Sequence, residues 1–450
     1  MNYSHDTIAA VSSPAGIGAV GLIRVSGEKA IDAVNTIFRG HDLHKATPRK
    51  ALFGTIVNGG DTVDEVLVIC FRSPASYTGE DLVEISCHGN PFILQQILTL
   101  LLQQVRMAEA GEFTQRAFLN NKMDLTRAEA VGDLLAATTR RAHFAAIQQM
   151  EGSLYDRIKG YLDRLTRIRS EVELEIDFVE QGLDEMDPSH LVADIRALQR
   201  DLQHLAATAE DGMIIKDGLK VSLVGAPNVG KSSIFNAMLQ SERAIVTPIP
   251  GTTRDYLEEA ISLDGYLLRL FDTAGLHTSD DAVEQIGISR SYDIISQSNL
   301  VLFITTNASW QPEYRSLATR IDHQKIIKVL NKADTFSPEE LQLFAKEGFI
   351  LCSTLAEDGL AQLKDELRRR VAVDDAEITD GMLNNSRQRA AVNRSIASLE
   401  KALTSAEAAL GYEFTAFDLQ EASRGLEEVI GHVSTDDILN QIFENFCVGK

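Results

Sequence analysis

The sequence predicts three structural parts: an α+β N-terminal domain, an all-α helical-bundle domain, and an α/β domain inserted between the two halves of the helical domain. Residues 1–119 alternate short β-like runs with helical patches. Residues 120–215 and 374–450 place apolar residues at intervals of three and four, as a helical bundle requires. Residues 216–373 change to a strand, a glycine loop and a helix, the usual start of an α/β domain.

Local patterns predict the elements of each part in order. In the N-terminal domain, four runs predict strands and a fifth predicts a helix: DTIAAVSS (6–13), AVGLIRVSG (19–27), EVLVICFR (65–72), DLVEISCHG (81–89) and the helical PFILQQILTLLLQQV (91–105). Three long periodic segments predict the first helical half: 127–150, 161–178 and 190–210. The inserted domain closes with the helix AQLKDELRRRV (361–371). After an acidic linker, DDAEITD (374–380), helical periodicity resumes at Ser386.

Composition and charge exclude several classes of protein. No apolar run approaches the roughly 18 residues that span a bilayer, and MNYSHDTIAA lacks the layout of a signal peptide. The four cysteines, at positions 70, 87, 352 and 447, form no CxxC pair, which argues against a disulfide framework or a zinc site. We therefore expect a cytoplasmic protein. The net charge of −22 argues against a protein that coats nucleic acid through its overall field.

A basic block interrupts this acidic background. Residues 139–170 hold seven Lys and Arg residues, whereas residues 171–187 hold eight acids and no base. Such a block is either a solvated helix face or a helical surface that faces RNA, and the sequence leaves both interpretations open. The seven basic residues are Arg140, Arg141, Arg157, Lys159, Arg164, Arg167 and Arg169.

Four short motifs occur in one fixed order: GAPNVGKSS (225–233), TTRD (252–255), DTAG (272–275) and NKAD (331–334). The first follows the apolar strand VSLV directly, as a phosphate-binding loop does at the start of a P-loop domain. Each motif has a separate physical role in holding a guanine nucleotide, so their joint appearance predicts a Ras-like P-loop domain that binds GTP.

The phosphate side of this site follows from the first two motifs. Gly225 and Gly230 let the loop backbone turn its N–H groups toward phosphates at the start of the next helix. Lys231 is expected to reach the β- and γ-phosphates, and the Ser232 hydroxyl to bind Mg²⁺. Thr253 is expected to be the second Mg²⁺ ligand, on a segment that orders with GTP and relaxes after hydrolysis.

The other motifs complete the site. Asp272 ends the strand LLRLFD and is expected to hold the magnesium shell through water, while the Gly275 N–H meets the γ-phosphate. Asp334 can accept both donors on the guanine edge, which adenine lacks, and Ser353 and Thr354 stand where a base-contacting loop belongs. The predicted GTP-contacting residues are Asn228, Val229, Gly230, Lys231, Ser232, Ser233, Thr247, Pro248, Ile249, Pro250, Gly251, Thr252, Thr253, Asp272, Thr273, Ala274, Gly275, Asn331, Lys332, Asp334, Ser353 and Thr354.

The residue after DTAG narrows the class of GTPase. Ras-like switches place a glutamine there to position the attacking water, whereas this chain has Leu276. An apolar side chain cannot orient water, so another group must do so. Glu284, in DDAVEQIG, is the candidate, with an exposed helix acid as the alternative. The sequence shows no obvious arginine finger, and it leaves open whether Arg254 supplies positive charge in the transition state.

Together with these motifs, longer stretches resemble the MnmE (TrmE) family of tRNA-modifying GTPases from bacteria and organelles. The resemblance covers essentially the whole chain, and a terminal Cys-aliphatic-Gly-Lys combined with an inserted GTPase domain is very specific. The matching stretches are DTIAAVSSPAGIGAVGLIRVSG (6–27), YTGEDLVEISCHGNP (77–91), GEFTQRAFLNNKMDLTRAEAVGDLL (111–135), AIVTPIPGTTRD (244–255) and FCVGK (446–450).

The resemblance implies that the N-terminal domain mediates dimerisation and binds a reduced folate, either 5-formyl- or methylene-tetrahydrofolate. By position, it assigns Arg24, Glu84, Lys122 and Lys450 to the folate. Without it, Arg24 and Glu84 would be ordinary strand-end charges. Cys447 is a family cysteine considered for thiol chemistry, with a small buried side chain that positions Lys450 as the plainer interpretation.

The resemblance also implies that potassium activates GTP hydrolysis when two G domains pair, the ion supplying the charge that an arginine finger gives elsewhere. The potassium ligands map to Asn228, Thr247, Ile249 and Thr252, and the family's water-positioning acid aligns with Glu284. The chain departs from the family pattern in four places. Pro248 and Pro250 stiffen the loop before TTRD, Ala110 replaces a proline, and Thr354 replaces an alanine.

The resulting expectation is a homodimeric GTPase that acts in a heterotetramer with an FAD-containing partner of the MnmG type. The two would attach an aminomethyl or carboxymethylaminomethyl group to the wobble uridine of certain tRNAs, with a carbon from the folate. Two alternatives are an RNA-binding assembly GTPase and a non-catalytic switch. The first should append a KH-like domain with a GxxG loop, a pattern that is missing after residue 375. In the second, the bound GTP only gates a partner. Loss of hydrolysis in Glu284→Ala, with GTP binding intact, would argue against it.

Overall fold

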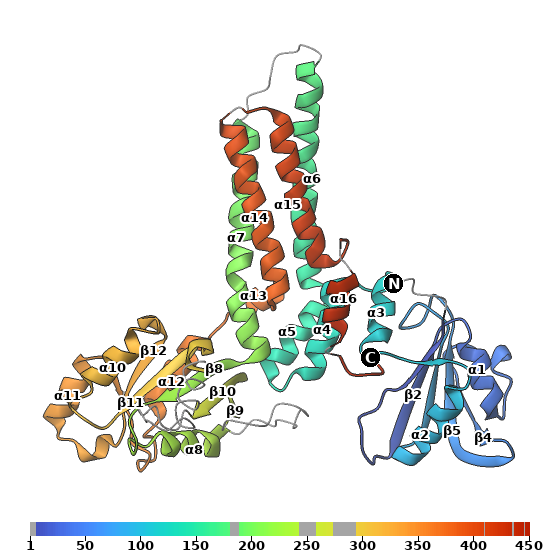
Figure 1. Ribbon diagram of the computed structural model, residues 1–450, viewed down its shortest axis with the longest axis horizontal. Coiled ribbons are helices and arrows are strands. Elements are labelled where there is room, and N and C mark those ends of the chain that lie inside the picture. Colours follow the sequence, from blue (N-terminus) through green and yellow to red (C-terminus); the bar gives the residue numbers. More distant parts are fainter. Residues whose placement is uncertain are drawn as a thin grey trace, which may run out of the picture. The chain divides into compact units, whose positions relative to one another are not determined.

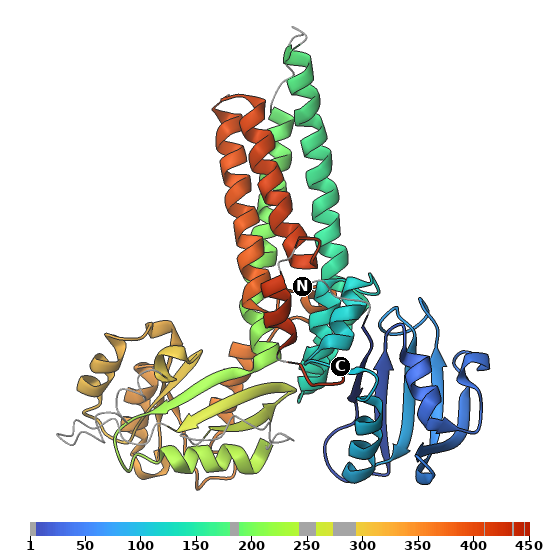
Figure 2. The ribbon, with the colours of Figure 1, turned by 45° about the vertical axis from the view of Figure 1, so that its right-hand side comes forward.

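The computed structural model describes residues 6–180, 189–242, 258–272, 294–408, 410–433, 436–444 and 446–450. Two compact units make up the chain. Unit 1 comprises Met1–Gly132, Met150–Ile195 and Ala397–Lys450, and unit 2 comprises Asp133–Gln149 and Arg196–Ile396. Figures 1 and 2 show the sheet and helices of each unit.

Unit 1 contains a seven-stranded sheet with the order β3-β4-β5-β6-β2-β1-β7. Neighbouring strands are antiparallel, apart from the parallel pair β1 and β7. The strands are β1 (Ile8–Val11), β2 (Val20–Ser26), β3 (Phe38–Arg39), β4 (Ala51–Asn58), β5 (Asp61–Phe71), β6 (Leu82–His88) and β7 (Arg106–Met107).

The two faces of this sheet pack against different helices, because successive strand residues point to opposite faces. One face packs against α1 (Ala30–Ile37) and α2 (Pro91–Leu101), together with the short η1 (Leu43–Lys45). On the other face, α3 (Glu112–Leu119) places Phe113 against Ile8. This confirms an α+β arrangement for the N-terminal residues.

Several elements of the sheet domain lie outside the predicted runs, among them α1 and β4. Gly54 interrupts the apolar alternation of β4, and its Cα lies so close to the Phe38 ring that a Cβ there would collide with the ring. The close packing of β4 on β3 therefore depends on a residue that weakens the strand pattern in the sequence.

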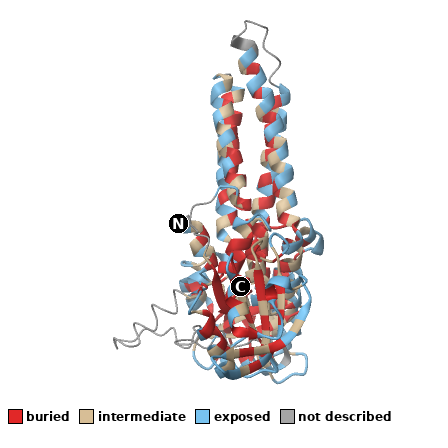
Figure 3. Cartoon of the chain, turned by 90° about the vertical axis from the view of Figure 1, so that its right-hand side faces the viewer, coloured by how far each residue is buried: buried red, intermediate tan, exposed pale blue. Residues whose placement is uncertain are grey.

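Long helices account for the predicted helical segments. They are α4 (Leu125–Ala136), α5 (Arg140–Glu151), α6 (Ser153–Glu180), α7 (Ser189–Asp217), α14 (Ser386–Glu407), α15 (Tyr412–Ile430) and α16 (Asp436–Phe443). Buried and exposed positions follow one another along these helices (Figure 3), as intervals of three and four require. Within the described residues, none of the helices combines the length and apolarity needed to cross a membrane.

Two of the helical predictions need correction. The segment 127–150 is not one continuous helix, because α4 ends at Ala136 and α5 begins at Arg140, with the Thr139 hydroxyl accepting a hydrogen bond from the Ala142 N–H at 3.3 Å. The predicted linker 374–380 contains a short helix, α13 (Asp375–Thr379), whose first turn is capped by the Asp374 carboxylate. Both errors arise from short polar side chains that can cap a helix as readily as they extend a loop.

Unit 2 contains a six-stranded sheet with the order β13-β12-β11-β8-β10-β9, parallel except for β9. Its strands are β8 (Leu219–Val224), β9 (Glu258–Leu263), β10 (Tyr266–Asp272), β11 (Leu300–Thr305), β12 (Ile326–Leu330) and β13 (Phe349–Leu351). One core contains residues of α8 (Lys231–Glu242) and α12 (Ala361–Val371), and the other contains residues of α10 (Gln311–Ala318) and α11 (Pro338–Lys346). Two short turns, η2 (His323–Lys325) and η3 (Ala333–Thr335), precede and follow β12. Because parallel strands end at one edge, the loops after β8, β10 and β12 lie at that edge.

Candidate functional site

The loop between β8 and α8 has the backbone shape of a phosphate-binding loop. Its residues run from Gly225 to Gly230, and α8 begins at Lys231. Asn228 and Gly230 both adopt left-handed backbone angles, with φ of 62° and 89°. A Cβ on Gly230 would collide with the Asn331 side-chain amide, so only glycine fits at that position.

Lys231 is held inside this loop. Its side-chain nitrogen donates hydrogen bonds to the carbonyl oxygens of Gly225 and Ala226 at 2.8 and 2.9 Å, and 8% of the residue is exposed. Burial lowers the pKa of Lys231, against the opposing effect of the Asp272 charge. The ammonium group is therefore already fixed at the loop, where a phosphate would contact it.

Ser232 and Asp272 meet although 40 positions separate them in the sequence. The Ser232 hydroxyl donates to Asp272 Oδ2 at 2.9 Å, and Asp272 Oδ1 is buried without a hydrogen-bond partner among the described residues. A hydroxyl beside a carboxylate with an unused oxygen fits Mg²⁺, which takes a few protein oxygens and completes its shell with water and phosphate. The described part of the chain contains no group of three or more His, Cys, Asp or Glu residues that could hold a metal by themselves.

The base side of the site joins three loops. Asn331 is buried and donates from Nδ2 to the Val229 carbonyl at 2.8 Å, which ties NKAD to the phosphate-binding loop. Lys332 Nζ donates to the Asn228 carbonyl at 3.3 Å. The Ser353 hydroxyl donates to Asp334 Oδ1 at 2.5 Å. The buried Asn331 Oδ1 has no hydrogen-bond partner among the described residues.

The loop around Ser353 has only a weak motif in the sequence, yet it lies against Asp334. The Ser353 N–H donates to the Gly359 carbonyl at 3.1 Å, and a Cβ on Gly359 would collide with the Ser353 carbonyl oxygen. Gly359 is therefore the residue that lets this loop close. Thr354, which follows Ser353, has an intermediate exposure.

Several predicted site residues lie outside the described residues. They are Thr247, Pro248, Ile249, Pro250, Gly251, Thr252, Thr253, Arg254, Thr273, Ala274, Gly275 and Glu284. Their roles stay predictions.

A second cluster of charged residues lies in unit 1. Arg24 on β2 and Glu84 on β6 are directly paired in the sheet, and Arg24 Nε donates to Glu84 Oε1 at 2.9 Å. The Arg24 guanidinium also lies over the Tyr77 ring, 5.6 Å from its centroid. Lys450 belongs to the same charge cluster: burial and then the Arg24 charge lower the pKa of Lys450, while Glu84 opposes them.

Backbone contacts hold the C-terminal residues at this cluster. The Ser12 hydroxyl donates to the Gly449 carbonyl at 2.9 Å, and the Phe113 N–H donates to the Lys450 carbonyl at 3.1 Å. Gly449 has a left-handed φ of 95°, and a Cβ there would collide with the Val11 carbonyl oxygen. The side chain of Cys447 is exposed, so the interpretation of a small buried cysteine is wrong, and the positioning comes from the backbone.

Lys122 differs from the other three predicted folate residues. Its Nζ donates to the Pro74 carbonyl at 2.9 Å, and among the described residues it forms no hydrogen bond or ion pair with Arg24, Glu84 or Lys450. Tyr77 was missed by the sequence analysis. Its hydroxyl shares a 2.9 Å hydrogen bond with Thr114, and its position in the matching stretch YTGED was the available signal.

Comparisons with known proteins extend over the whole chain. The family described as MnmE helical domain matches residues 125–447, and the family described as GTP-binding protein TrmE N-terminus matches residues 7–122. The tRNA modification GTPase MnmE of Clostridioides difficile is 37% identical over 100% of both chains. Those of Syntrophus aciditrophicus and Finegoldia magna are 37% and 39% identical, over 99% of this chain and 99% and 100% of their own. The chain belongs to the MnmE family.

The matched ranges include most of both sites. The MnmE helical domain range contains the described nucleotide-site residues from Gly225 to Thr354, and the TrmE N-terminus range contains Arg24, Glu84 and Lys122. Lys450 lies beyond both matched ranges. The hydrogen bond from the Phe113 N–H of α3 to its carbonyl, and that from Ser12 to the neighbouring Gly449, hold it in unit 1 independently of the MnmE comparison.

Proposed function

We propose that the chain is a potassium-activated GTP hydrolase of tRNA modification. With an FAD-dependent MnmG-type partner, it modifies the wobble uridine of certain tRNAs with an aminomethyl or carboxymethylaminomethyl group. The observation that carries the GTPase assignment is the meeting of Lys231, the Ser232–Asp272 pair and the Asp334–Ser353 pair on loops of one sheet. Membership of the MnmE family supports the tRNA substrate.

The nucleotide site divides its work among these groups. Lys231 contacts the β- and γ-phosphates, Ser232 and Thr253 would hold Mg²⁺, and Asp272 would hold the shell of the ion through water. The ion would neutralise charge on the phosphate oxygens. Asp334 accepts hydrogen bonds from the guanine edge, and the Ser353 hydroxyl keeps that carboxylate in place. Glu284 positions the attacking water.

Asn228 supports the potassium proposal. Its left-handed backbone exposes the residue at the loop, and its carbonyl accepts a hydrogen bond from Lys332. An amide oxygen here suits a monovalent cation that supplies positive charge next to the phosphates. Thr247, Ile249 and Thr252 complete the proposed potassium shell when two G domains pair in a homodimer.

The charge cluster in unit 1 supports the folate proposal. A folate carries carboxylates at its glutamate tail and N–H donors on its pterin ring, and the cluster offers Arg24 and Lys450 to the former and Glu84 to the latter. In this proposal Lys122 contributes from the neighbouring loop, and Cys447 takes part in thiol chemistry at its exposed position. The folate supplies a one-carbon unit, the partner holds the FAD, and the complex acts in the cytoplasm.

The experiment that tests the proposal is GTP turnover by the full-length chain in KCl and in NaCl at equal ionic strength, over a range of protein concentrations. We expect turnover in KCl to be about 10- to 100-fold faster, because the ion adds a positive charge at the developing phosphate charge. The ratio of turnover in KCl to turnover in NaCl should increase with protein concentration if pairing of two G domains forms the potassium site. Equal slow rates in both salts would contradict potassium activation, and unchanged turnover in Glu284→Ala would contradict the role of that residue.

A further inference from the structure

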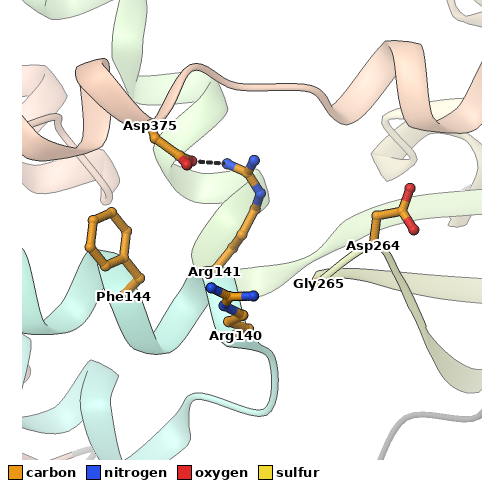
Figure 4. A pocket seen from close by; sticks show the side chains of 6 residues that line it. All are labelled: Arg140, Arg141, Phe144, Asp264, Gly265 and Asp375. Carbon is orange, nitrogen blue, oxygen red and sulfur yellow. Dashed lines mark hydrogen bonds and ion pairs between the residues drawn. The ribbon is translucent and has the colours of Figure 1, made fainter.

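A cavity of about 300 Å³ lies in unit 2, at the start of α5, the turn between β9 and β10, and the start of α13. Its lining does not include Lys231, Asp272 or Asp334, and no function discussed above uses it. Figure 4 shows the six residues that line it: Arg140, Arg141, Phe144, Asp264, Gly265 and Asp375.

The lining residues include two arginines and two aspartates, but only one of the two arginines is paired with a lining carboxylate. Arg141 donates to Asp375 at 2.7 Å, and Arg368 forms an ion pair with Asp264 at 2.7 Å, so both carboxylates at the cavity have a cationic partner. Arg140 has no hydrogen-bond or ion-pair partner among the residues that the structure describes, and its side chain is exposed. Arg140 is therefore the guanidinium of the cavity lining that has no partner among the described residues.

Arg141 lines one side of the cavity and is held there by several contacts. Besides Asp375, its guanidinium donates to the Val373 carbonyl at 3.1 Å and lies 4.5 Å from the centroid of the Tyr266 ring. Its backbone N–H donates to the Gly265 carbonyl at 3.4 Å. These contacts fix Arg141 against the hairpin and leave Arg140 as the group available to a ligand.

Phe144 adds an aromatic surface to the same cavity. It follows Arg140 by four residues on α5, so both side chains lie on one face of the helix. The Phe144 residue is 37% exposed, although α5 buries neighbours such as Ala142 and Ala146. Figure 4 shows both Arg140 and Phe144 at the cavity with α5 as their common support.

We propose that this cavity binds one nucleotide of the tRNA substrate, with its phosphate on Arg140 and its base against Phe144. This rests on the proposed function, because it assigns a contact to the tRNA. A planar guanidinium binds phosphate oxygens in pairs, and unstacked RNA bases bind on aromatic side chains. The volume is at the lower end of the range for small-ligand sites, which suits a single nucleotide better than a protein segment.

The carboxylates favour a base over a simple anion. Asp264 and Asp375 are 62% and 72% exposed at their side chains, and their charges are compensated by Arg368 and Arg141. Carboxylate oxygens accept hydrogen bonds from the amino groups of bases. A free inorganic phosphate would use Arg140 alone, whereas a nucleotide uses the guanidinium, the ring and the acceptors together.

The experiment is the binding of a fluorescently labelled, unmodified tRNA transcript to the full-length chain, measured by anisotropy over a series of KCl concentrations. The variants are Arg140→Ala, Arg140→Lys and Phe144→Ala. Arg389→Ala is the matched control, since Arg389 is an exposed arginine of α14 in the same unit, away from the cavity lining. Thermal melting and GTP turnover of each variant check that its fold is intact.

We expect Arg140→Ala to weaken tRNA binding about 5- to 10-fold and to reduce the slope of log K against log salt by just under one, because one phosphate contact is lost. Arg140→Lys should keep the slope. Phe144→Ala should weaken binding about tenfold without changing the slope, since stacking releases no counterions. Arg389→Ala should leave both quantities unchanged.

Unchanged affinity in both Arg140→Ala and Phe144→Ala, with wild-type melting, would overturn the proposal. An equal loss in Arg389→Ala would also overturn it, because the effect would then be one of general charge. The proposed function fails separately: absence of GTP turnover by the wild-type chain in KCl would contradict it, while the tRNA measurement would still test the cavity.

Discussion

The loops after β8, β10 and β12, together called the GTP loops, reach their geometry differently from the charge cluster of Arg24, Glu84 and Lys450. In the GTP loops, Lys231 bonds to carbonyls five and six residues away, and parallel strands bring the remaining motifs to a common sheet edge. In the charge cluster, a hydrogen bond joins Ser12 and Gly449 across 437 positions. Local backbone shape builds the first site, whereas the second depends on where the end of the chain returns.

This difference predicts that the two sites respond independently to substitution. The loops should lose function through single side chains that touch phosphate, metal or base. The cluster should lose function through anything that displaces the last residues, including backbone changes. Five substitution experiments test this contrast.

The largest effect is expected from Lys231→Ala. Turnover of GTP should fall about 10²- to 10³-fold, because a preorganised cation at the phosphates is removed. Binding of 5-formyl-tetrahydrofolate, measured by calorimetry, should stay at the wild-type level. Lys346→Ala removes an exposed lysine at the end of α11 and is the matched control. Turnover within threefold of wild type would contradict the role of Lys231.

The next effect is a change of base preference in Asp334→Asn. The affinity for GTP should fall about 100-fold, because charged hydrogen bonds contribute roughly 1.5–3 kcal/mol each. An amide offers a donor in place of a carboxylate oxygen, so xanthosine triphosphate, with a carbonyl in place of the guanine amino group, should gain affinity. Competition against a fluorescent nucleotide measures both.

Ser353→Ala sharpens the same point. Removing the hydroxyl frees the Asp334 carboxylate without changing its charge, so GTP affinity should fall only about fivefold, or about 1 kcal/mol. Equal losses in Ser353→Ala and Asp334→Asn would mean that the loop conformation, and not the carboxylate, determines base binding.

Much of the GTP site could be predicted from the sequence because each motif specifies its own backbone. Gly230 requires a left-handed angle, and Lys231 follows at the start of a helix whatever the rest of the chain does. The Ser353 loop has a weaker pattern because Gly359, the residue that lets it close, is six positions away and resembles any loop glycine. The order of motifs along β8, β10 and β12 then gives the common edge without further information.

The charge cluster could not be derived from residue patterns. Arg24 and Glu84 are one charge each on ordinary strands, and nothing in their spacing shows that they pair in register. The last residues are held by hydrogen bonds from the Ser12 hydroxyl to the Gly449 carbonyl and from the Phe113 N–H to the Lys450 carbonyl, and no sequence motif announces either bond. Only the resemblance to MnmE pointed there, and the plainer interpretation of Cys447 as a small buried side chain was wrong, because that side chain is exposed.

Two substitutions in the last residues of the chain, here called the tail (446–450), test how these residues are held. Lys450→Ala should weaken 5-formyl-tetrahydrofolate binding about tenfold through the loss of one ion pair or charged hydrogen bond. Gly449→Ala should weaken it by a similar factor while keeping the lysine, because a Cβ would collide with the Val11 carbonyl and displace the tail. Lys401→Ala, an exposed lysine of α14 in the same unit, is the control, and GTP turnover should be unchanged in all three. Normal folate affinity in Gly449→Ala would contradict the dependence on backbone position.

The smallest effect concerns the pKa of Lys450, which burial and the Arg24 charge lower from 10.5. Glu84→Gln should lower the pKa further, because the opposing negative charge is removed, and Arg24→Gln should raise it. Nuclear magnetic resonance titration of labelled lysine follows both changes, with Lys401 as an internal reference. Between the lowered folded pKa and 10.5, the unfolded chain binds more protons than the folded chain, so the contribution of Lys450 to stability rises with pH across that window. A pKa that stays unchanged in both variants would mean that burial alone lowers it, and that the three charges of the cluster do not act on one another.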